Sequence, residues 1–285
     1  MKRDEFRFTE RLRVRWAEVD LQKIVFNGHY LTYFDVAVAG YWRAMAMPYH
    51  LTMERLGGDL YARKATLEYE SSARFDDVLD VGVRCAKMGN SSMVLTCAVY
   101  RGDELLVPGE LVYVFADPAT QKSKPIPQDL REWITAFEAG KPMTEVRIGS
   151  WATLGADAKR IRTEVFVQEQ GIPPEMEWDD ADDGCLHAVA YNRVGLPLAT
   201  GRLLEHVPGV AKIGRMAVSQ SMRGSGVGRA VLDALMKAAR DRGEREAVLH
   251  AQLSAAPFYS RLGFTTRGPT FDDVGIPHVE MVRML

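Results

Sequence analysis

The chain has 285 residues, more than a single hydrophobic core usually serves, so two domains are predicted. Hydrophobic residues at 47% and charged residues at 26% are ordinary for a globular protein and argue against a disordered or fibrous chain. The formal net charge of −2 is nearly balanced in both halves, and no apolar run suits a membrane span or signal peptide, so we expect a cytoplasmic protein that binds neither nucleic acid nor membrane.

The first 120 residues read as a strand, a long helix and four further strands. Residues 6–20 are strand-like, and residues 28–46 are predicted to form an amphipathic helix because apolar positions recur every three or four residues. Those positions are Tyr30, Phe34, Val38, Tyr41 and Met45. The further strands are expected at 60–74, 77–88, 91–101 and 104–116, with turn signals between the last three. This order predicts one helix wrapped by an antiparallel sheet.

A polar stretch that contains prolines interrupts this pattern at residues 117–127. A short helix is predicted next, with Leu130, Ile134 and Phe137 at helical spacing and Gly140 as its stop. We expect a linker near 140–146, and therefore one domain at 1–142 and a second at 143–285.

The second half has a different order of elements. A helix is predicted near 154–168, and a second helix at 226–240 follows a glycine-rich turn. Strands are expected at 185–192, 197–204, 211–219 and 247–253. A strand, a glycine turn, a helix and a strand in succession are typical of a ligand-binding α/β sheet.

The glycine-rich turn predicts an anion site. Gly224, Gly226 and Gly228 lie between a strand and a helix, where free amide groups, the helix dipole and the side chains of Arg223 and Arg229 would hold a pyrophosphate. No Lys-Ser/Thr pair follows the last glycine, so this is not a Walker loop. The glycines alone would also fit a helix start without a ligand.

Two motifs in this half resemble the GNAT superfamily of N-acetyltransferases. Arg223, Gly226 and Gly228 match its R-x-x-G-x-G signature, and the strand Met216, Ala217, Val218 comes before them. The segment from His250 to Phe264 resembles a later superfamily element that ends in an FYxxxGF block. The resemblance covers roughly residues 145–285 and implies a mixed α/β GNAT domain.

The resemblance implies acetyl transfer from acetyl-CoA to a small-molecule or peptide amine. The backbone of Met216 and Val218 would pair with the pantetheine arm. The pyrophosphate would be held by Arg223, Gly224, Ser225, Gly226, Val227, Gly228 and Arg229. Tyr259 matches the position that protonates the departing CoA thiolate, which a hydroxyl group can do. A core tyrosine packed beside Phe258 and Phe264 is the alternative.

The amine must lose a proton, so a general base is needed. The acidic stretch 169–187 offers Glu169, Glu177, Asp179 and His187, and it would suit a cationic amine. For Asp180, Asp182 and Asp183 we favour a solvated surface. The segments at 165–179 and 275–281 resemble one bacterial GNAT subgroup, which adds His278 and Glu280 as pocket candidates.

Residues 8–120 resemble the hotdog-fold acyl-CoA thioesterases related to 4-hydroxybenzoyl-CoA thioesterase, an α+β fold. In that family a strand ends in an aspartate, a short loop follows, and the central helix starts near a tyrosine. Here these features are Asp20, the loop 21–28 and Tyr30. Family members often have a glycine in this loop, where this chain has Gln22 and Lys23, and often a histidine-type residue where Asn27 lies.

Thioester hydrolysis needs a carboxylate or an activated water, and donors that polarise the carbonyl group. The resemblance implies that Asp20 is the base or nucleophile and that backbone amides around Asn27, Gly28 and His29 polarise the carbonyl. Asn27 or His29 could also orient water or substrate. A loop or capping carboxylate is the alternative for Asp20, and a structural role is the alternative for His29. Hotdog domains generally pair, which implies a homodimer or a larger homo-oligomer.

The leading hypothesis is a bifunctional enzyme that uses acyl-CoA and acetyl-CoA as substrates. The alternatives are an acetyltransferase with a catalytically silent, acyl-CoA-binding or dimerising hotdog domain, and a non-enzymatic acyl-CoA sensor. Substrates carried on acyl carrier protein are a more remote alternative for the first domain. Cys85, Cys97 and Cys185 have no metal-ligand spacing, so buried free thiols and no metal are expected.

Overall fold

The computed structural model describes all 285 residues. The chain divides into two compact units, Met1–Met143 and Thr144–Leu285. None of the helices combines the length and the apolar character needed to cross a membrane.

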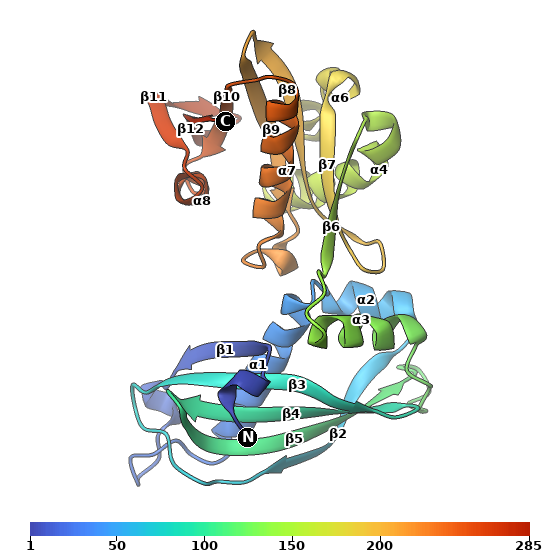
Figure 1. Cartoon of the computed structure of the whole chain (residues 1–285), viewed down its shortest axis with the longest axis vertical. Coiled ribbons are helices and arrows are strands. Elements are labelled where there is room, and N and C mark those ends of the chain that lie inside the picture. Colours follow the sequence, from blue (N-terminus) through green and yellow to red (C-terminus); the bar gives the residue numbers. More distant parts are fainter. The chain divides into compact units, whose positions relative to one another are not determined.

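The first unit is a five-stranded antiparallel sheet that curves around one long helix, α1 (His29–Ala44) (Figure 1). The strands follow the order β1-β3-β4-β5-β2. They are β1 (Phe8–Arg13), β2 (Asp59–Leu67), β3 (Val78–Met88), β4 (Ser92–Arg101) and β5 (Glu104–Ala116). The predicted α+β architecture is therefore confirmed for this unit. The five apolar positions predicted for the helix face are all buried, because α1 presents that face to the sheet.

Two further helices complete the first unit, α2 (Tyr49–Leu56) and α3 (Gln128–Glu138). α3 is anchored by two polar residues. Trp133 donates its indole N–H to the carbonyl of Met45 at 2.9 Å, and Glu138 accepts hydrogen bonds from the Tyr41 hydroxyl and from the Cys85 amide. The helix predicted after the polar stretch thus packs against the end of α1 and against β3.

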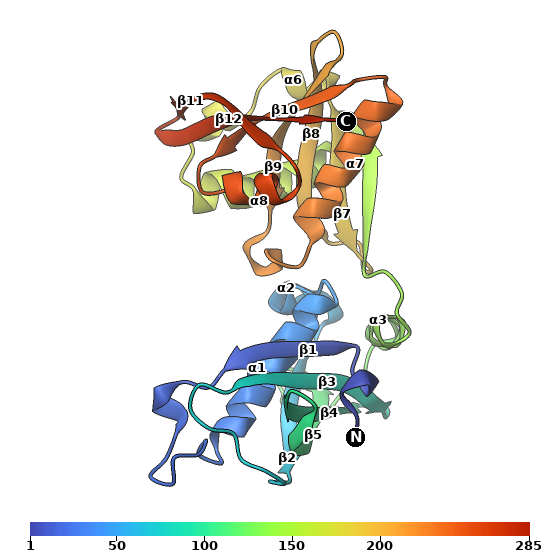
Figure 2. The same ribbon diagram turned by 60° about the vertical axis from the view of Figure 1, so that its left-hand side comes forward.

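The second unit is a seven-stranded sheet in the order β11-β12-β10-β9-β8-β7-β6 (Figures 1 and 2). Its strands are β6 (Thr144–Gly149), β7 (Leu186–Asn192), β8 (Pro197–Val207), β9 (Val210–Val218), β10 (Glu246–Gln252), β11 (Thr265–Asp273) and β12 (Ile276–Met284). The helices are α4 (Trp151–Arg162), α5 (Pro174–Glu177), α6 (Ala181–Gly184), α7 (Val227–Asp241) and α8 (Ala256–Arg261). Only the β9–β10 pair is parallel, so the predicted mixed α/β domain is confirmed.

Helices α4 and α7 cover opposite faces of this sheet. Val189 of β7 packs against Leu154 and Ala158 of α4. On β8, a Cβ atom built at Gly201 would lie 2.9 Å from Leu235 of α7, and Gly201 pairs with Ala188, the neighbour of Val189. Because successive residues of a strand point to opposite faces, the two helices lie on the two sides of the core.

Four predicted boundaries were wrong. The strand expected at 6–20 spans only Phe8–Arg13 and is followed by a 3-10 helix at Trp16–Glu18. The linker expected at 140–146 overlaps β6, which begins at Thr144 and pairs with β7. The strand expected at 60–74 ends at Leu67 and continues as a loop. The helix expected at 154–168 is α4 followed by a π-helix, Thr163–Glu169. Of the cysteines, Cys97 and Cys185 are buried as expected, and Cys85 is half-buried.

Candidate functional sites

Asp20 lies in a tight hairpin of the first unit. Val19 and Val25 form an antiparallel bridge, and the Asp20 amide donates to the Ile24 carbonyl at 2.9 Å. Lys23 has a φ of 63°, the left-handed conformation that glycine favours, and its amide donates to the Asp20 carbonyl at 3.0 Å. The loop therefore closes without a glycine. Asp20 Oδ1 accepts the Gln22 amide at 2.8 Å, which leaves Oδ2 without a hydrogen bond.

A cavity of about 300 Å³ opens beside this hairpin and the start of α1. Its polar lining consists of Asp20, Gln22, Asn27, Ser71 and Ser72. Its apolar lining consists of Ile24, Val25, Phe26, Tyr30 and Tyr69. Three residues predicted from the sequence, Asp20, Asn27 and Tyr30, are thus brought together in one cavity. The arrangement can place a carboxylate next to an apolar group of modest size.

The structure narrows the predicted set of amide donors. The His29 amide donates to the Phe26 carbonyl at 2.9 Å and is therefore not available to a substrate. The amides of Asn27 and Gly28, at the N-terminus of α1, make no backbone hydrogen bond. The imidazole of His29 packs edge-on against the Phe26 ring and is not part of the cavity lining, so a role of this ring in orienting water or substrate stays a prediction.

Tyr30 and Glu18 fix the helix start next to the cavity. The buried Tyr30 hydroxyl accepts the Ala73 amide at 3.0 Å, and burial raises the pKa of Tyr30. Glu18, only 3% exposed, accepts the Arg15 amide at 2.7 Å and the Tyr33 hydroxyl at 2.8 Å. Burial alone would raise the pKa of Glu18, but the hydrogen bonds from the Arg15 amide, the Arg15 guanidinium and the Tyr33 hydroxyl outweigh it and lower the pKa. Neither the role of Glu18 nor the contribution of the loop after β2 to the cavity was predicted, because both depend on contacts distant in sequence.

In the second unit, β9 and β10 separate along their length. Their parallel pairing covers Val210–Ile213 and Glu246–Leu249, whereas β9 continues to Val218 and β10 to Gln252. The edge of β9 that faces β10 is therefore free of strand pairing over the segment 214–218. This segment contains Met216, Ala217 and Val218, so the structure offers an unpaired backbone where the sequence predicted pantetheine binding.

The glycine loop follows β9 after one short 3-10 helix, Gln220–Met222. Gly224 and Gly226 have φ values of 80° and 89°, and no atom lies within 4 Å of a Cβ built at either position. Gly226 is the N-cap of α7, so its neighbouring amides point away from the helix. At Gly228 a Cβ would lie 3.0 Å from Val218 of β9 and 3.9 Å from Phe258 of α8. Thus β9, the N-terminus of α7 and α8 meet at the closely packed Gly228, and the open, exposed positions Gly224 and Gly226 before it suit an anion.

The two arginines of the loop are paired with carboxylates. Arg223 forms a bidentate ion pair with Glu169, at 2.7 and 2.5 Å, and Arg229 lies 3.4 Å from Asp233 on the same helix face. The hydrogen bond from Arg223 lowers the pKa of Glu169. A carboxylate held ionised in this way is a poor general base, so Glu169 is better described as the partner of Arg223 than as the base.

Replacing Gly226 with alanine is expected to weaken CoA binding by at least about tenfold, because an L-residue at a φ of 89° costs roughly 1–2 kcal/mol and the loop would relax away from its open form. Gly209→Ala is a matched control, since Gly209 has a φ of 83° in the β8–β9 turn, outside the loop. Both variants should lose similar thermal stability. Isothermal titration with CoA should separate them, and an equal affinity in both would contradict a role for the loop.

Tyr259 lies on α8 between two aromatic rings. Its ring centroid is 5.0 Å from that of Phe258 and 5.9 Å from that of Phe264, both edge-on. The ring is 8% exposed, its hydroxyl makes no hydrogen bond within the protein, and burial raises its pKa to about 12. Phe258, the neighbour of Tyr259 on α8, borders Gly228. The ring is held by packing, and the hydroxyl is left free to donate.

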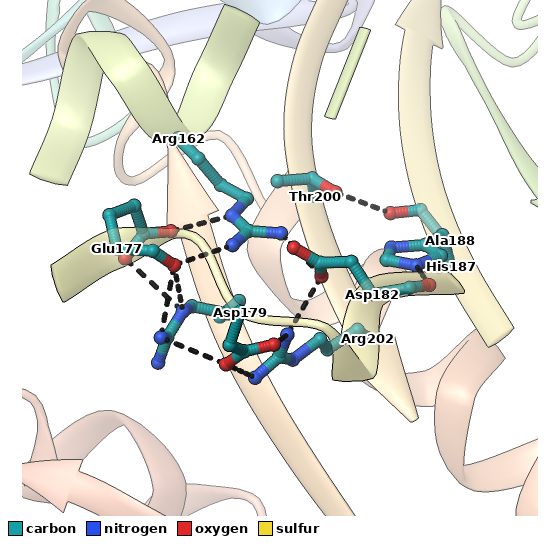
Figure 3. Close-up of polar contacts among 9 residues, drawn as sticks. Arg162, Glu177, Asp179, Asp182, His187, Ala188, Thr200 and Arg202 are labelled. Atoms are coloured by element: carbon teal, nitrogen blue, oxygen red, sulfur yellow. Dashed lines mark hydrogen bonds and ion pairs between the residues drawn. The ribbon is translucent and has the colours of Figure 1, made fainter. Parts of the chain in front are cut away.

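The acidic stretch was predicted to face solvent or a cationic amine, and this interpretation was wrong for its central residues. Arg162 binds Glu177 at 2.6 Å and Asp182 at 2.7 Å, and Arg202 binds Asp182 and Asp179 (Figure 3). Glu177 and Asp182 are 3% and 4% exposed. Burial raises the pKa of Glu177, and the neighbouring guanidinium groups partly offset this. The carboxylates pair with arginines of the same unit, so Glu177 is not available to an amine.

The predicted histidines also have partners within the second unit. His187 is 1% exposed, packs on Trp151, and its Nε2 lies 2.8 Å from the Asp182 carbonyl; burial lowers its pKa. His278 stacks on Phe271, with Nδ1 2.7 Å from the Ile276 carbonyl. Neither ring is a hydrogen-bond partner of Tyr259. The general base is thus not identified among these candidates. No group of three His, Cys, Asp or Glu side chains gathers in a metal-binding arrangement.

Two family models match this chain, and each match lies within one of the two units of the fold. Residues 166–285 match the model of the acetyltransferase (GNAT) domain, and residues 22–108 match that of the thioesterase superfamily. The uncharacterized N-acetyltransferase YjcF of Bacillus subtilis is 39% identical over 128 residues, which cover 45% of this chain and 90% of that protein.

Solved structures similar to the chain include two thioesterases. One, from Thermus thermophilus, was solved in complex with coenzyme A and Zn; it has 26% identity and a TM-score of 0.43, covering 49% of this chain and 99% of that one. The other is a 1,4-dihydroxy-2-naphthoyl-CoA thioesterase from Synechocystis, with 17% identity and a TM-score of 0.42, covering 45% of this chain and 95% of that one.

Proposed function

Because the chain belongs to the GNAT acetyltransferase family through its second unit and contains a thioesterase-superfamily domain in its first, we propose that it is a bifunctional enzyme of CoA thioesters. The first unit would hydrolyse an acyl-CoA, and the second would transfer an acetyl group from acetyl-CoA to an amine. The proposal for the second unit depends on one observation, the convergence of the free β9 edge, the glycine loop and α8 at Gly228.

In the proposed hydrolysis, Asp20 acts on the thioester carbonyl carbon, either directly or through a water molecule. The free amides of Asn27 and Gly28 lie at the N-terminus of α1, where the helix dipole favours the negative charge that develops on the carbonyl oxygen. The acyl group would occupy the cavity against Phe26 and Tyr69, two apolar side chains that are about half exposed. Because Lys23 already has the left-handed conformation, the missing glycine does not alter the backbone of this loop, which supports an active domain over a silent one.

In the proposed transfer, acetyl-CoA lies along the free edge of β9 with its pyrophosphate at the glycine loop. The backbone of Met216 and Val218 would pair with the pantetheine arm, as a strand would. The amine nitrogen attacks the acetyl carbon, the C–S bond breaks, and the Tyr259 hydroxyl gives its proton to the departing sulfur. The proton that the amine loses passes to solvent, and solvent returns a proton to Tyr259.

A pair of assays on the full chain tests these activities separately. Release of CoA thiol from acetyl-, aromatic and long-chain acyl-CoAs without an amine measures hydrolysis, after correction for the three cysteines. Acetyl transfer to a panel of small amines and peptide N-termini, followed by mass spectrometry, measures the second activity. No turnover in either assay, despite CoA binding, would favour an acyl-CoA sensor.

Strand β2 is at the edge of its sheet, where its backbone can pair with a strand of a second copy, and this supports the predicted homodimer. Light scattering of the full chain would test the homodimer.

A further inference from the structure

The segment of β9 that is proposed to bind acetyl-CoA begins with a β-bulge. On β8, Thr200 pairs with Ala217 and Arg202 pairs with Gly214. One residue of β8, Gly201, therefore faces two residues of β9, Arg215 and Met216. A bulge of this kind bends the strand and changes the direction of the groups that follow. Here the residues that follow are Ala217 and Val218, which pair with β8 on one side and have no strand partner on the side that faces β10.

The first bulge residue has an unusual backbone. Arg215 has a φ of 49°, the left-handed region that L-residues other than glycine, asparagine and aspartate rarely adopt. In a conformational equilibrium this preference disfavours the observed form by about 5- to 30-fold. Other contacts must therefore hold Arg215 in place, because its own backbone preference opposes the bulge.

The Arg215 side chain supplies those contacts. Its Nε lies 3.1 Å from Glu177 Oε2 and 3.2 Å from the Glu177 carbonyl, and its Nη2 lies 3.3 Å from Asp179 Oδ2. The two carboxylates that bind Arg215 are themselves bound by other arginines. Glu177 is bound by the buried Arg162, and Asp179 is bound by two nitrogens of Arg202 at 2.6 and 2.7 Å (Figure 3).

The ion pairs with Asp179 connect the bulge to both strands. Arg202 belongs to β8 and pairs with Gly214 directly before the bulge, whereas Arg215 belongs to β9, and both bind Asp179. Arg162 is 1% exposed and Glu177 is 3% exposed, so water competes little for the bond between them, whereas the side chains of Arg215 and Asp179 are 28% and 39% exposed. Paired and hydrogen-bonded guanidinium groups of this kind have a defined geometry, which suits them to fixing a backbone.

We propose that Arg215 is a positioning residue, which holds the β9 bulge through Glu177 and Asp179 and thereby directs the backbone of Met216–Val218 toward the acyl-CoA thioester. The inference rests on the proposed function of this unit. It gives Glu177 and Asp179 a role in positioning the cofactor that requires no contact with the amine.

Two substitutions at this position separate the proposed role from a charge effect. Arg215→Ala and Arg215→Gly both remove the guanidinium and leave the same carboxylates without it. Alanine retains the backbone preference against a φ of 49°, whereas glycine has none. Isothermal titration of the full chain with CoA and with acetyl-CoA should give a Kd about tenfold weaker for Arg215→Ala and within about threefold of the wild type for Arg215→Gly.

Arg215→Asn, which tolerates the left-handed region, should lie between the two, and it replaces the alanine variant in the comparison if thermal melts show that variant to be unfolded. Equal losses in the glycine and alanine variants, or no loss in any variant, would overturn the positioning role while leaving the acetyltransferase assignment intact. If the wild-type chain bound neither CoA nor acetyl-CoA, the proposed function would fail, and this inference with it.

Discussion

Replacing Asp20 with asparagine is expected to reduce acyl-CoA hydrolysis by at least about 100-fold, because the amide can neither accept a proton nor act as a nucleophile. The substitution keeps the local structure, since an asparagine oxygen can accept the Gln22 amide as Asp20 Oδ1 does at 2.8 Å. CoA-thiol release from the preferred acyl-CoA gives kcat and KM. The loss should be in kcat, because the cavity lining that contacts the acyl group is unchanged.

Asp103→Asn is a matched control for this experiment. Asp103 is an exposed carboxylate in the turn between β4 and β5, outside the cavity lining, so the same change there should leave hydrolysis within about twofold of the wild type. Wild-type turnover in Asp20→Asn would mean that Asp20 is a loop carboxylate that stabilises its hairpin. The thioesterase proposal would then need another nucleophile or base in the cavity.

Replacing Tyr259 with phenylalanine is expected to lower kcat for acetyl transfer by about 100-fold and to leave the Kd for acetyl-CoA within about twofold. The reason is that the change removes only a hydroxyl group that has no protein partner, while the ring contacts with Phe258 and Phe264 remain. Thermal stability should change little for the same reason. If Tyr259 were only a core residue, the Tyr259→Phe variant would keep the kcat of the wild type.

Tyr191→Phe provides the opposite pattern as a control. The Tyr191 hydroxyl donates to Asp157 at 2.6 Å, so its removal should destabilise the second unit by about 1 kcal/mol without affecting kcat. Stability and activity would thus respond to different tyrosines, as measured by thermal melts and by transfer rates on the same preparations.

The pH dependence of transfer gives an independent check on Tyr259. Burial raises its pKa to about 12, so the hydroxyl keeps its proton at every pH below that value. An acid with a raised pKa is lost only as the pH rises through it, so transfer should not decline between pH ~7 and ~10 through this group. A decline in kcat in that range that disappears in Tyr259→Phe would contradict the assignment.

The fold was largely predictable where the signals are local. The helix α1 follows from apolar residues every three or four positions, and β3, β4 and β5 follow from turn residues at Gly89 and Gly102. The glycine loop was predicted because three glycines lie between a strand and a helix, and the structure shows positive φ values at Gly224 and Gly226. The roles of Asp20 and Tyr259 remain predictions, and the structure contributes their surroundings.

The acidic segment is the clearest case that only the tertiary structure could decide. From the sequence, Asp182 looks like part of a solvated charge run, because its partners Arg162 and Arg202 lie 20 residues away in either direction. Likewise, Asp20 lines the same cavity as Ser71 and Ser72 only because the loop after β2 folds back against α1. The physical reason is common to both. Periodicity and turn chemistry report which face of a segment is buried, whereas the pairing of a charge depends on which distant group the fold places beside it.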